Sequence, residues 1–185
     1  MRVYLDTNIL VAYFKPGDPY YSDSRTILEK TDIDKIVSFL TLTEFLSVIF
    51  RLYRNSQIEF TPKIREIFSQ LPLKSRAVIL LKYIVRKFNL NILGAKELLN
   101  FRINSENILF PLEFLKAINM AGETGLRTLD NLHLAIVALE NKVSKIDYFI
   151  TGDRDFINKR QIVFRVTGVP VLTPSEFAHL LGLKH

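Results

Sequence analysis

Four carboxylates stand where short apolar runs meet the starts of predicted helices. Asp6 follows the strand-like run at 3–5, and Asp153 follows a second such run at 148–150. Glu44 and Asp130 each lie in the first turn of a predicted helix. In an open parallel sheet, the ends of the strands and the helices that follow them meet at one edge, where ligands bind. The pattern therefore predicts that the four carboxylates converge on one cleft.

Carboxylates that lie this close together favour a divalent cation. They repel one another and raise one another's pKa unless a cation neutralises them. The chain has no cysteine, which excludes thiolate metal sites and disulfides. Hard oxygen ligands without thiolates favour Mg²⁺ or Mn²⁺. Such a site activates water and stabilises charge at a scissile phosphate.

Each acid also has a purely structural explanation. Asp6 can cap the helix behind it, a role that Thr7 and Asn8 could share. Glu44 completes a capping box in the sequence TLTE at 41–44. Asp130 complements the positive end of a helix dipole, and Asp153 suits the turn after a strand. The sequence leaves these explanations open for each residue taken singly.

The elements that position these residues alternate between strand and helix. Strands are predicted near 3–5, 35–39, 148–150 and 169–172, and the strongest helix is predicted at 128–142. This alternation predicts an α/β fold, with a central parallel sheet flanked by helices. Helical spacing interrupted by prolines predicts a helical insertion at about 60–115. No linker composition is evident, so a single domain over 1–185 is expected.

The charge balance permits a polyanionic partner without requiring one. The chain has 25 basic and 19 acidic residues, a net charge of +6. The basic residues form two clusters: Lys82, Arg86 and Lys87, and then Arg154, Lys159 and Arg160. The first cluster is best explained as a solvated helix face. The second follows Asp153, and the sequence does not decide whether it contacts phosphates or is an ordinary basic surface.

No membrane association is expected from the sequence. It has no run of roughly 18 apolar residues, so no transmembrane helix is predicted. The N-terminus does not resemble a signal peptide, because Asp6 interrupts its apolar stretch. These features predict a soluble cytoplasmic protein.

Several short motifs occur in an order that resembles the PIN-domain family. They are LDTNIL at 5–10, TEF at 43–45, LDNLHLA at 129–135, TGDRDF at 151–156 and the ending VPVLTPSEF at 169–177. The resemblance implies a Rossmann-like fold and a metal-dependent ribonuclease. It implies that Asp6, Glu44, Asp130 and Asp153 form the catalytic acidic metal site. It further implies accessory roles for Thr7, Asn8, Thr151 and Asp155.

The resemblance also bears on partners. Many family members are VapC-type toxins of toxin–antitoxin pairs, and others process ribosomal RNA or act in RNA quality control. Small toxin members place the acids that match Glu44 and Asp130 much closer together, so the insertion at 60–115 leaves both roles open. An antitoxin is a candidate partner. A homodimer is expected, because the helix around 78–84 is apolar on more than one face.

These inferences lead to one main expectation and one alternative. We expect a Mg²⁺- or Mn²⁺-dependent endoribonuclease acting on RNA. The alternative is a non-catalytic RNA-binding or RNA-processing assembly protein with the same fold. A haloacid-dehalogenase-type phosphatase is disfavoured because it would need aspartate where this chain has Asn8. His133 is expected to be a packed or hydrogen-bonded residue rather than a catalytic one.

Overall fold

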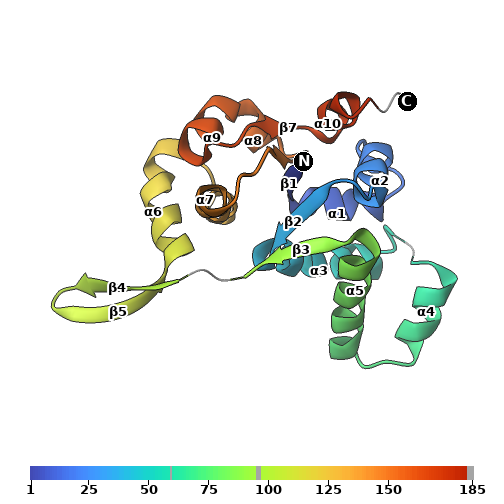
Figure 1. Cartoon of the computed structure of the whole chain (residues 1–185). Coiled ribbons are helices and arrows are strands. Elements are labelled where there is room, and N and C mark those ends of the chain that lie inside the picture. The colour runs from blue at the N-terminus through green and yellow to red at the C-terminus, as the bar shows by residue number, and fades with distance from the viewer. Residues whose placement is uncertain (59, 95–96, 183–185) are drawn as a thin grey trace.

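A five-stranded parallel sheet forms the centre of the computed structural model, which describes residues 1–58, 60–94 and 97–182 (Figure 1). The strand order is β3-β2-β1-β6-β7, and every neighbouring pair is parallel. The chain moves from β1 outward to β2 and β3, and later returns beside β1 with β6. The switch point of the sheet therefore lies between β1 and β6, the place where open α/β sheets bind ligands. The strands are β1 (Arg2–Leu5), β2 (Asp34–Ser38), β3 (Leu90–Leu93), β6 (Tyr148–Ile150) and β7 (Val171–Leu172).

Helices cover both faces of this sheet, as predicted. The side chains of β1 alternate between two apolar clusters: Val3 and Leu5 pack on one face, and Tyr4 packs on the other. Both faces are buried, which explains why the strand is a continuous apolar run. In the described ranges, no helix is long and apolar enough to cross a bilayer. The helices are α1 (Thr7–Tyr13), α2 (Tyr21–Glu29), α3 (Phe39–Arg54), α4 (Pro62–Ser69), α5 (Leu73–Phe88), α6 (Leu112–Thr124), α7 (Thr128–Val143), α8 (Arg154–Asn158), α9 (Arg160–Thr167) and α10 (Pro174–Leu180).

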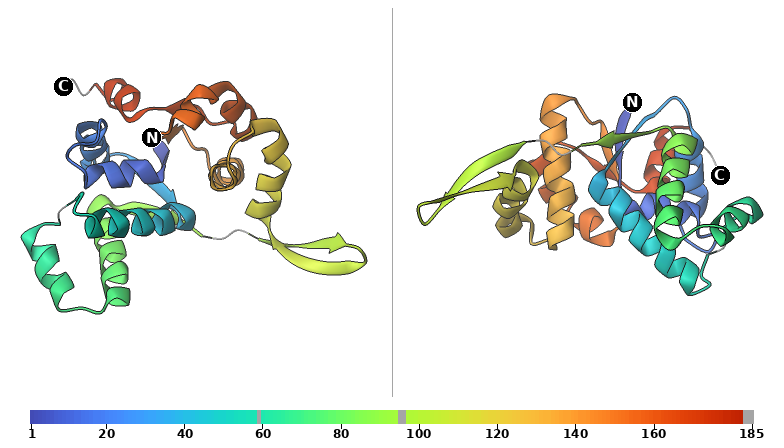
Figure 2. Two further views of the ribbon diagram at one scale, coloured as in Figure 1. Left: turned by 180° about the vertical axis from the view of Figure 1, so that it is seen from behind. Right: turned by 90° about the horizontal axis from the view of Figure 1, so that it is seen from below.

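The segment at about 60–115 is helical only in part. The helices α4 and α5 agree with the prediction, but β3 joins the edge of the central sheet beside β2. The strands β4 (Leu98–Ile103) and β5 (Glu106–Pro111) then form an antiparallel hairpin that projects from the rest of the molecule (Figure 2). Asn104 and Ser105 both have positive φ at its turn, as a tight two-residue hairpin turn requires. These strands were not predicted, because their apolar residues also fit a helical spacing and because Asn-Ser is a weaker turn signal than Asn-Gly.

The start of α1 confirms one predicted cap, whereas the start of α3 contradicts another. The cap of α1 is Asp6, whose carboxylate accepts a hydrogen bond from the Thr7 N–H, whereas Thr7 and Asn8 lie inside the helix. The helix α3 starts at Phe39 with a capping box between Ser38 and Thr41. The capping box predicted for Glu44 is therefore wrong. Glu44 lies beyond the first turn of α3, so its conformation has a different cause.

Candidate active site

The four predicted acids line one cleft at the switch point of the sheet. Its volume is about 420 Å³. The end of β1, the helices α3 and α7, and the segment after β6 each contribute one of these acids. Thr7, Asn8 and His133 also line this cleft. Side chains from four distant parts of the sequence thus face one space.

Asp6 is the most rigidly held of the acids. It is buried, and its Oδ1 accepts the Thr7 N–H at 2.7 Å. Its Oδ2 accepts hydrogen bonds from the Asn8 amide and the Thr151 hydroxyl, each at 2.6 Å. Burial raises the pKa of Asp6, although the charge of His133 and these hydrogen bonds oppose that rise. The hydrogen bonds therefore fix the orientation of the Asp6 carboxylate, but its surroundings do not fully stabilise its negative charge.

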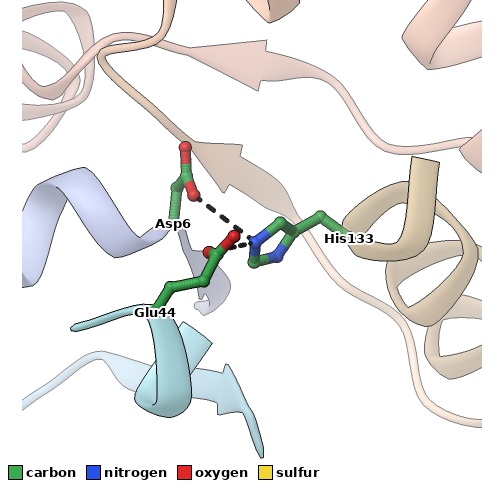
Figure 3. A group of neighbouring side chains, drawn as sticks. All are labelled: Asp6, Glu44 and His133. Atoms are coloured by element: carbon green, nitrogen blue, oxygen red, sulfur yellow. Dashed lines mark hydrogen bonds and ion pairs between the residues drawn. The ribbon is translucent and has the colours of Figure 1, made fainter. Parts of the chain in front are cut away.

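Glu44 and His133 form the second part of the cleft wall (Figure 3). The Glu44 carboxylate accepts the Thr7 hydroxyl at 2.6 Å and pairs with His133 Nε2 at 2.8 Å. His133 Nε2 also lies 3.9 Å from the Asp6 carboxylate. The Nδ1 atom of His133 is 2.9 Å from the Tyr4 hydroxyl. His133 is thus the hydrogen-bonded residue that the sequence predicted, and it also faces two of the acids.

The electrostatics of this group favour a protonated histidine. Burial opposes the charged form of His133, but Tyr4, the Glu44 hydrogen bond and the Asp6 charge outweigh it and raise the pKa to about 10. For Glu44, burial acts to raise the pKa, yet the hydrogen bonds from His133 and Thr7 prevail and lower it. Without a bound cation, the imidazolium partly offsets the charge of the two carboxylates.

Asp130 and Asp153 complete the acidic wall. Asp130 lies in the first turn of α7 and accepts the Arg127 N–H at 3.3 Å. Burial, then the charge of Asp153, and more weakly that of Asp6, raise the pKa of Asp130. Asp153 caps α8, and its own N–H donates to the Thr151 hydroxyl at 2.9 Å. The acids therefore affect one another electrostatically, which is the condition under which a carboxylate cluster favours a cation.

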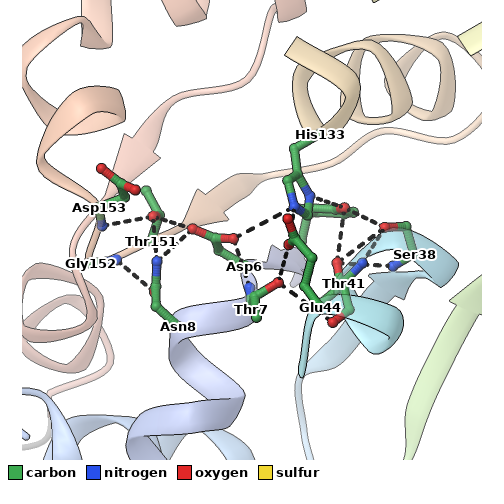
Figure 4. Close-up of polar contacts among 11 residues, drawn as sticks. Asp6, Thr7, Asn8, Ser38, Thr41, Glu44, His133, Thr151, Gly152 and Asp153 are labelled. Atoms are coloured by element: carbon green, nitrogen blue, oxygen red, sulfur yellow. Dashed lines mark hydrogen bonds and ion pairs between the residues drawn. The ribbon is translucent and has the colours of Figure 1, made fainter. Parts of the chain in front are cut away.

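Two of the residues predicted as accessory, Asn8 and Thr151, connect the segment after β1 to the segment after β6 through hydrogen bonds (Figure 4). Thr151 is fully buried, and its hydroxyl bonds Asp6 and accepts from the Asn8 amide at 3.1 Å. The Asn8 amide oxygen accepts the Gly152 N–H at 2.9 Å. A Cβ at Gly152 would lie 2.7 Å from the Tyr20 ring, so a larger residue there would require the Tyr20 side chain to move. Asp155 differs, because it is exposed and does not line the cleft.

The three cations predicted to bind substrate lie outside the cleft lining. Lys159 Nζ donates to the carbonyls of Thr124 and Gly125 at 3.0 and 2.8 Å. Arg160 forms an ion pair with Glu176. Arg154 is exposed on α8. Two of these side chains thus make contacts within the protein, and their contact with phosphates stays a prediction.

The sequence analysis did not identify Tyr4 as part of the site's support. Its hydroxyl contacts Ser38 Oγ at 2.8 Å and Thr41 Oγ1 at 3.1 Å, besides the His133 ring. This buried network holds the Nδ1 side of the His133 ring, which is the side away from the acids. The available signal was a tyrosine in an otherwise aliphatic strand, since a buried tyrosine hydroxyl needs a partner.

The donor atoms in the cleft fit a divalent cation. One ligand atom each from Asp6, Glu44 and His133 lie within 4.8 Å of one another. The two carboxylate oxygens suit Mg²⁺ or Mn²⁺. The His133 imidazolium would have to lose its Nε2 proton before that nitrogen could bind a metal. The Thr7 and Thr151 hydroxyls hold the carboxylates in place, as the supporting partners of metal ligands usually do.

Comparison with protein families matches residues 3–161 to the PIN domain. The matched range includes every acid that lines the cleft. The chain therefore belongs to the PIN-domain family, a family of nucleases.

Three solved structures of VapC and VapBC proteins are similar to this chain, and one of them has a TM-score above 0.5. VapC20 of Mycobacterium tuberculosis, described as a Sarcin-Ricin loop cleaving toxin, has 14% identity and a TM-score of 0.51, over 84% of this chain and 93% of that one. VapBC2 of Rickettsia felis, bound to a promoter DNA fragment, has 15% identity and a TM-score of 0.47, over 94% and 98%. VapBC-1 of nontypeable Haemophilus influenzae has 14% identity and a TM-score of 0.49, over 95% and 99%. No match was found among curated proteins.

Proposed function

We propose that this protein is a Mg²⁺- or Mn²⁺-dependent endoribonuclease that cleaves phosphodiester bonds in the cleft. The observation that carries the proposal is the convergence of Asp6, Glu44, Asp130 and Asp153 on one space at the switch point of the sheet. Membership of a nuclease family supports it. The raised pKa values of Asp6 and Asp130 support it further, because they mark carboxylates that a cation would stabilise.

The residues of the cleft divide the work of the proposed reaction. Asp6, Glu44, Asp130 and Asp153 would hold the cation, with His133 beside Asp6 and Glu44. A divalent cation in such a site supplies an activated water and shields charge on the phosphoryl oxygens. Thr7, Asn8 and Thr151 orient the carboxylates through the hydrogen bonds described above. No covalent bond between the enzyme and the phosphate is required.

RNA is the proposed substrate class, and a toxin role is the proposed context. VapC20 shares the fold and is described as a toxin that cleaves the Sarcin-Ricin loop, which supports both parts of the proposal. A partner protein would find exposed apolar side chains on β4, β5 and α6: Leu98, Leu109, Phe114 and Ile118. The antitoxin partner and the homodimer stay predictions.

The helix around 78–84 offers less free apolar surface than its sequence suggested. Leu80 and Ile84 are buried against the core, whereas Val78 is 50% exposed. Part of the apolar surplus that predicted a dimer is therefore used inside the protein. The exposed side chains on the hairpin and α6 are the stronger basis for expecting a protein partner.

A cleavage assay tests the proposed function. Purified wild-type protein should cut end-labelled single-stranded RNA with added Mg²⁺ or Mn²⁺, and chelator should stop it. Asp6→Asn and Asp130→Asn should each reduce the rate by orders of magnitude. Asp147→Asn, which changes a carboxylate outside the cleft, is the matched control and should cleave normally. Chelator-resistant cleavage that survives both cleft variants would refute the mechanism. Binding without cleavage would favour the non-catalytic alternative.

A further inference from the structure

A second charged surface lies at the opposite end of α1 from the acidic cleft. Two neighbouring hollows of about 200 and 550 Å³ share Tyr83 and Lys87 in their walls. The first hollow lies between α1, α2, α5 and the start of α4, and the second lies along α5. We call this region the basic–aromatic surface, and define it as Tyr13, Tyr21, Arg25, Lys82, Tyr83, Arg86 and Lys87.

Positive charge dominates this surface. Arg25, Lys82, Arg86 and Lys87 are all exposed. Among the described residues, no carboxylate lines either hollow. Glu29 lies beside the surface, where it pairs with Arg25 at 3.5 Å and accepts the Tyr13 hydroxyl at 3.1 Å. Both contacts are exposed, and exposed ion pairs are weak in water. Lys82 and Arg86 lie one helical turn apart on α5, where like charges destabilise a helix. A polyanion would relieve this repulsion.

Half-buried tyrosines separate these cations. Lys87 Nζ donates to the Tyr13 hydroxyl and lies 4.8 Å from that ring centre and 5.5 Å from the Tyr83 ring centre. Arg25 lies over the Tyr21 ring at 5.7 Å. Each of these tyrosines is thus in contact with a cation and is partly accessible. Cations that would meet phosphates, beside rings on which bases can stack, are the pattern of a single-strand binding surface.

The helix α1 connects this surface to the cleft. Thr7, Asn8 and Val11 line the cleft, whereas Tyr13 lines the first hollow. Thr7 and Tyr13 are the two ends of α1, so the regions lie roughly 10 Å apart along its axis at about 1.5 Å per residue. One nucleic-acid strand can therefore reach both regions.

We propose that the basic–aromatic surface binds single-stranded RNA and holds the substrate strand outside the acidic cleft. This inference rests on the proposed function, because it takes RNA as the ligand. An acidic protein segment would use the cations alone. The tyrosines favour RNA, since bases can stack on the accessible parts of these half-buried residues. The solvated helix face favoured for Lys82, Arg86 and Lys87 on sequence alone thus becomes part of a binding site.

Binding measurements with paired variants test this inference. The anisotropy of a fluorescent, unstructured RNA is measured with chelator present, at several salt concentrations. The double variant Lys82→Ala/Arg86→Ala should weaken binding about tenfold or more at low salt, and should lower the slope of log affinity against log salt by about 1.4. Tyr83→Leu should weaken binding about fivefold or more without changing that slope, because it removes stacking rather than charge.

Three controls keep the result interpretable. Lys142→Ala/Lys145→Ala removes the same charge from the last turn of α7 and the loop after it, and this variant should bind RNA nearly as the wild type does. Thermal unfolding of each variant verifies that it is folded. Polyglutamate serves as a competitor without bases. A loss of affinity as large in the Lys142/Lys145 variant, or no effect of Tyr83→Leu together with equal competition by polyglutamate, would overturn the inference.

Cleavage measurements separate this inference from the proposed function. If the surface holds the strand, its variants should cut a long RNA slowly but cut a fragment short enough to occupy the cleft alone at the wild-type rate. Impaired binding by the surface variants, with no cleavage by the wild type, would uphold the inference and refute the nuclease. Cleavage by the wild type, with unchanged RNA binding in the surface variants, would do the reverse.

Discussion

The two ends of α1 gather charge of opposite sign by different structural means. At its start, Asp6 is buried and receives hydrogen bonds from Thr7, Asn8 and Thr151. At its end, the cations around Tyr13 are exposed on the helices α2 and α5. Burial and hydrogen bonding fix the positions of reacting groups, which chemistry requires. Exposure leaves the cations free to adapt, which suffices for holding a flexible polyanion.

The largest expected effect is a difference in RNA cleavage between variants of Asp153 and Asp155, two aspartates that lie two residues apart. Asp153 lines the cleft, whereas Asp155 is exposed and does not line it. Asp153→Asn should therefore reduce RNA cleavage by orders of magnitude, and Asp155→Asn should change it little. Rates of cleavage of one labelled RNA at saturating Mn²⁺ provide the measurement. Equal losses in both variants would mean that the charge of the whole segment matters, rather than the cleft.

A smaller effect is expected from a residue that only orients the acids. Thr151→Val keeps the shape but removes the hydroxyl that donates to Asp6 at 2.6 Å. Loss of such a supporting partner reduces metal affinity or activity about 10- to 100-fold. Thr167→Val is the matched control, because that buried hydroxyl bonds the Val163 carbonyl away from the cleft. Mn²⁺ affinity, measured by calorimetry, should fall in the first variant alone.

The stability of the metal-free protein should respond in opposite directions to two Asp→Asn changes. Asp130→Asn removes a carboxylate whose pKa is raised by burial and by Asp153, so the variant should be no less stable than the wild type. Asp6→Asn should destabilise by about 1–3 kcal/mol, because its new N–H₂ group faces a hydrogen-bond donor whichever oxygen it replaces. Urea unfolding with chelator measures both, and a loss in Asp130→Asn would mean that its negative charge is stabilising.

The smallest effect concerns pH, and it compares Asp130 with a carboxylate outside the cleft. The Arg2 N–H lowers the pKa of Asp147 below its ordinary value of 3.8, with a further contribution from Lys145. Its stabilising contribution, about 1 kcal/mol or less, should be present above pH 3.8 and be lost as the pH falls through the lowered pKa.

The ionised Asp130 carboxylate contributes to stability with the opposite sign from Asp147. Its pKa is raised in the folded protein, so its ionised form destabilises above that pKa, and this penalty vanishes below 3.8. The stability changes in Asp147→Asn and Asp130→Asn should therefore differ in sign near pH 7 and both disappear in strong acid. Unfolding curves across pH, with chelator, measure this, and changes of the same sign would contradict the assigned environments.

Much of the site could be predicted because it depends on local sequence signals. Asp6 and Asp153 were predicted as site residues because each follows an apolar strand. Asp130 was predicted because it lies in the first turn of a long apolar helix. The parallel sheet then places these positions at one edge. The predicted capping box for Glu44 was wrong, because Ser38 at the end of β2 could cap the helix earlier. Local propensity does not decide between two adjacent capping choices, since tertiary packing selects the start.

The remaining features depend on contacts between distant segments. The strand β3 pairs with β2 at the edge of the sheet. Asn89, in the left-handed conformation, ends α5 just before it, but a helix end alone does not predict that a strand follows. The hydroxyl of Tyr4 finds His133 across 129 positions of sequence. The basic–aromatic surface likewise joins α1, α2 and α5, so the sequence showed the cations of α5 without the tyrosines of α1 and α2. These elements required the fold itself.

The account depends most directly on whether the acidic cleft holds a divalent cation. The measurement is thermal unfolding of the chelator-treated protein during a Mn²⁺ titration, compared between the wild type and a Glu44→Gln/Asp130→Asn double variant. We predict that Mn²⁺ stabilises the wild type by about 2.7 kcal/mol when it exceeds its dissociation constant a hundredfold, and that the double variant needs far more metal for the same gain. The same Mn²⁺ response in both proteins, or none in the wild type, would contradict the account.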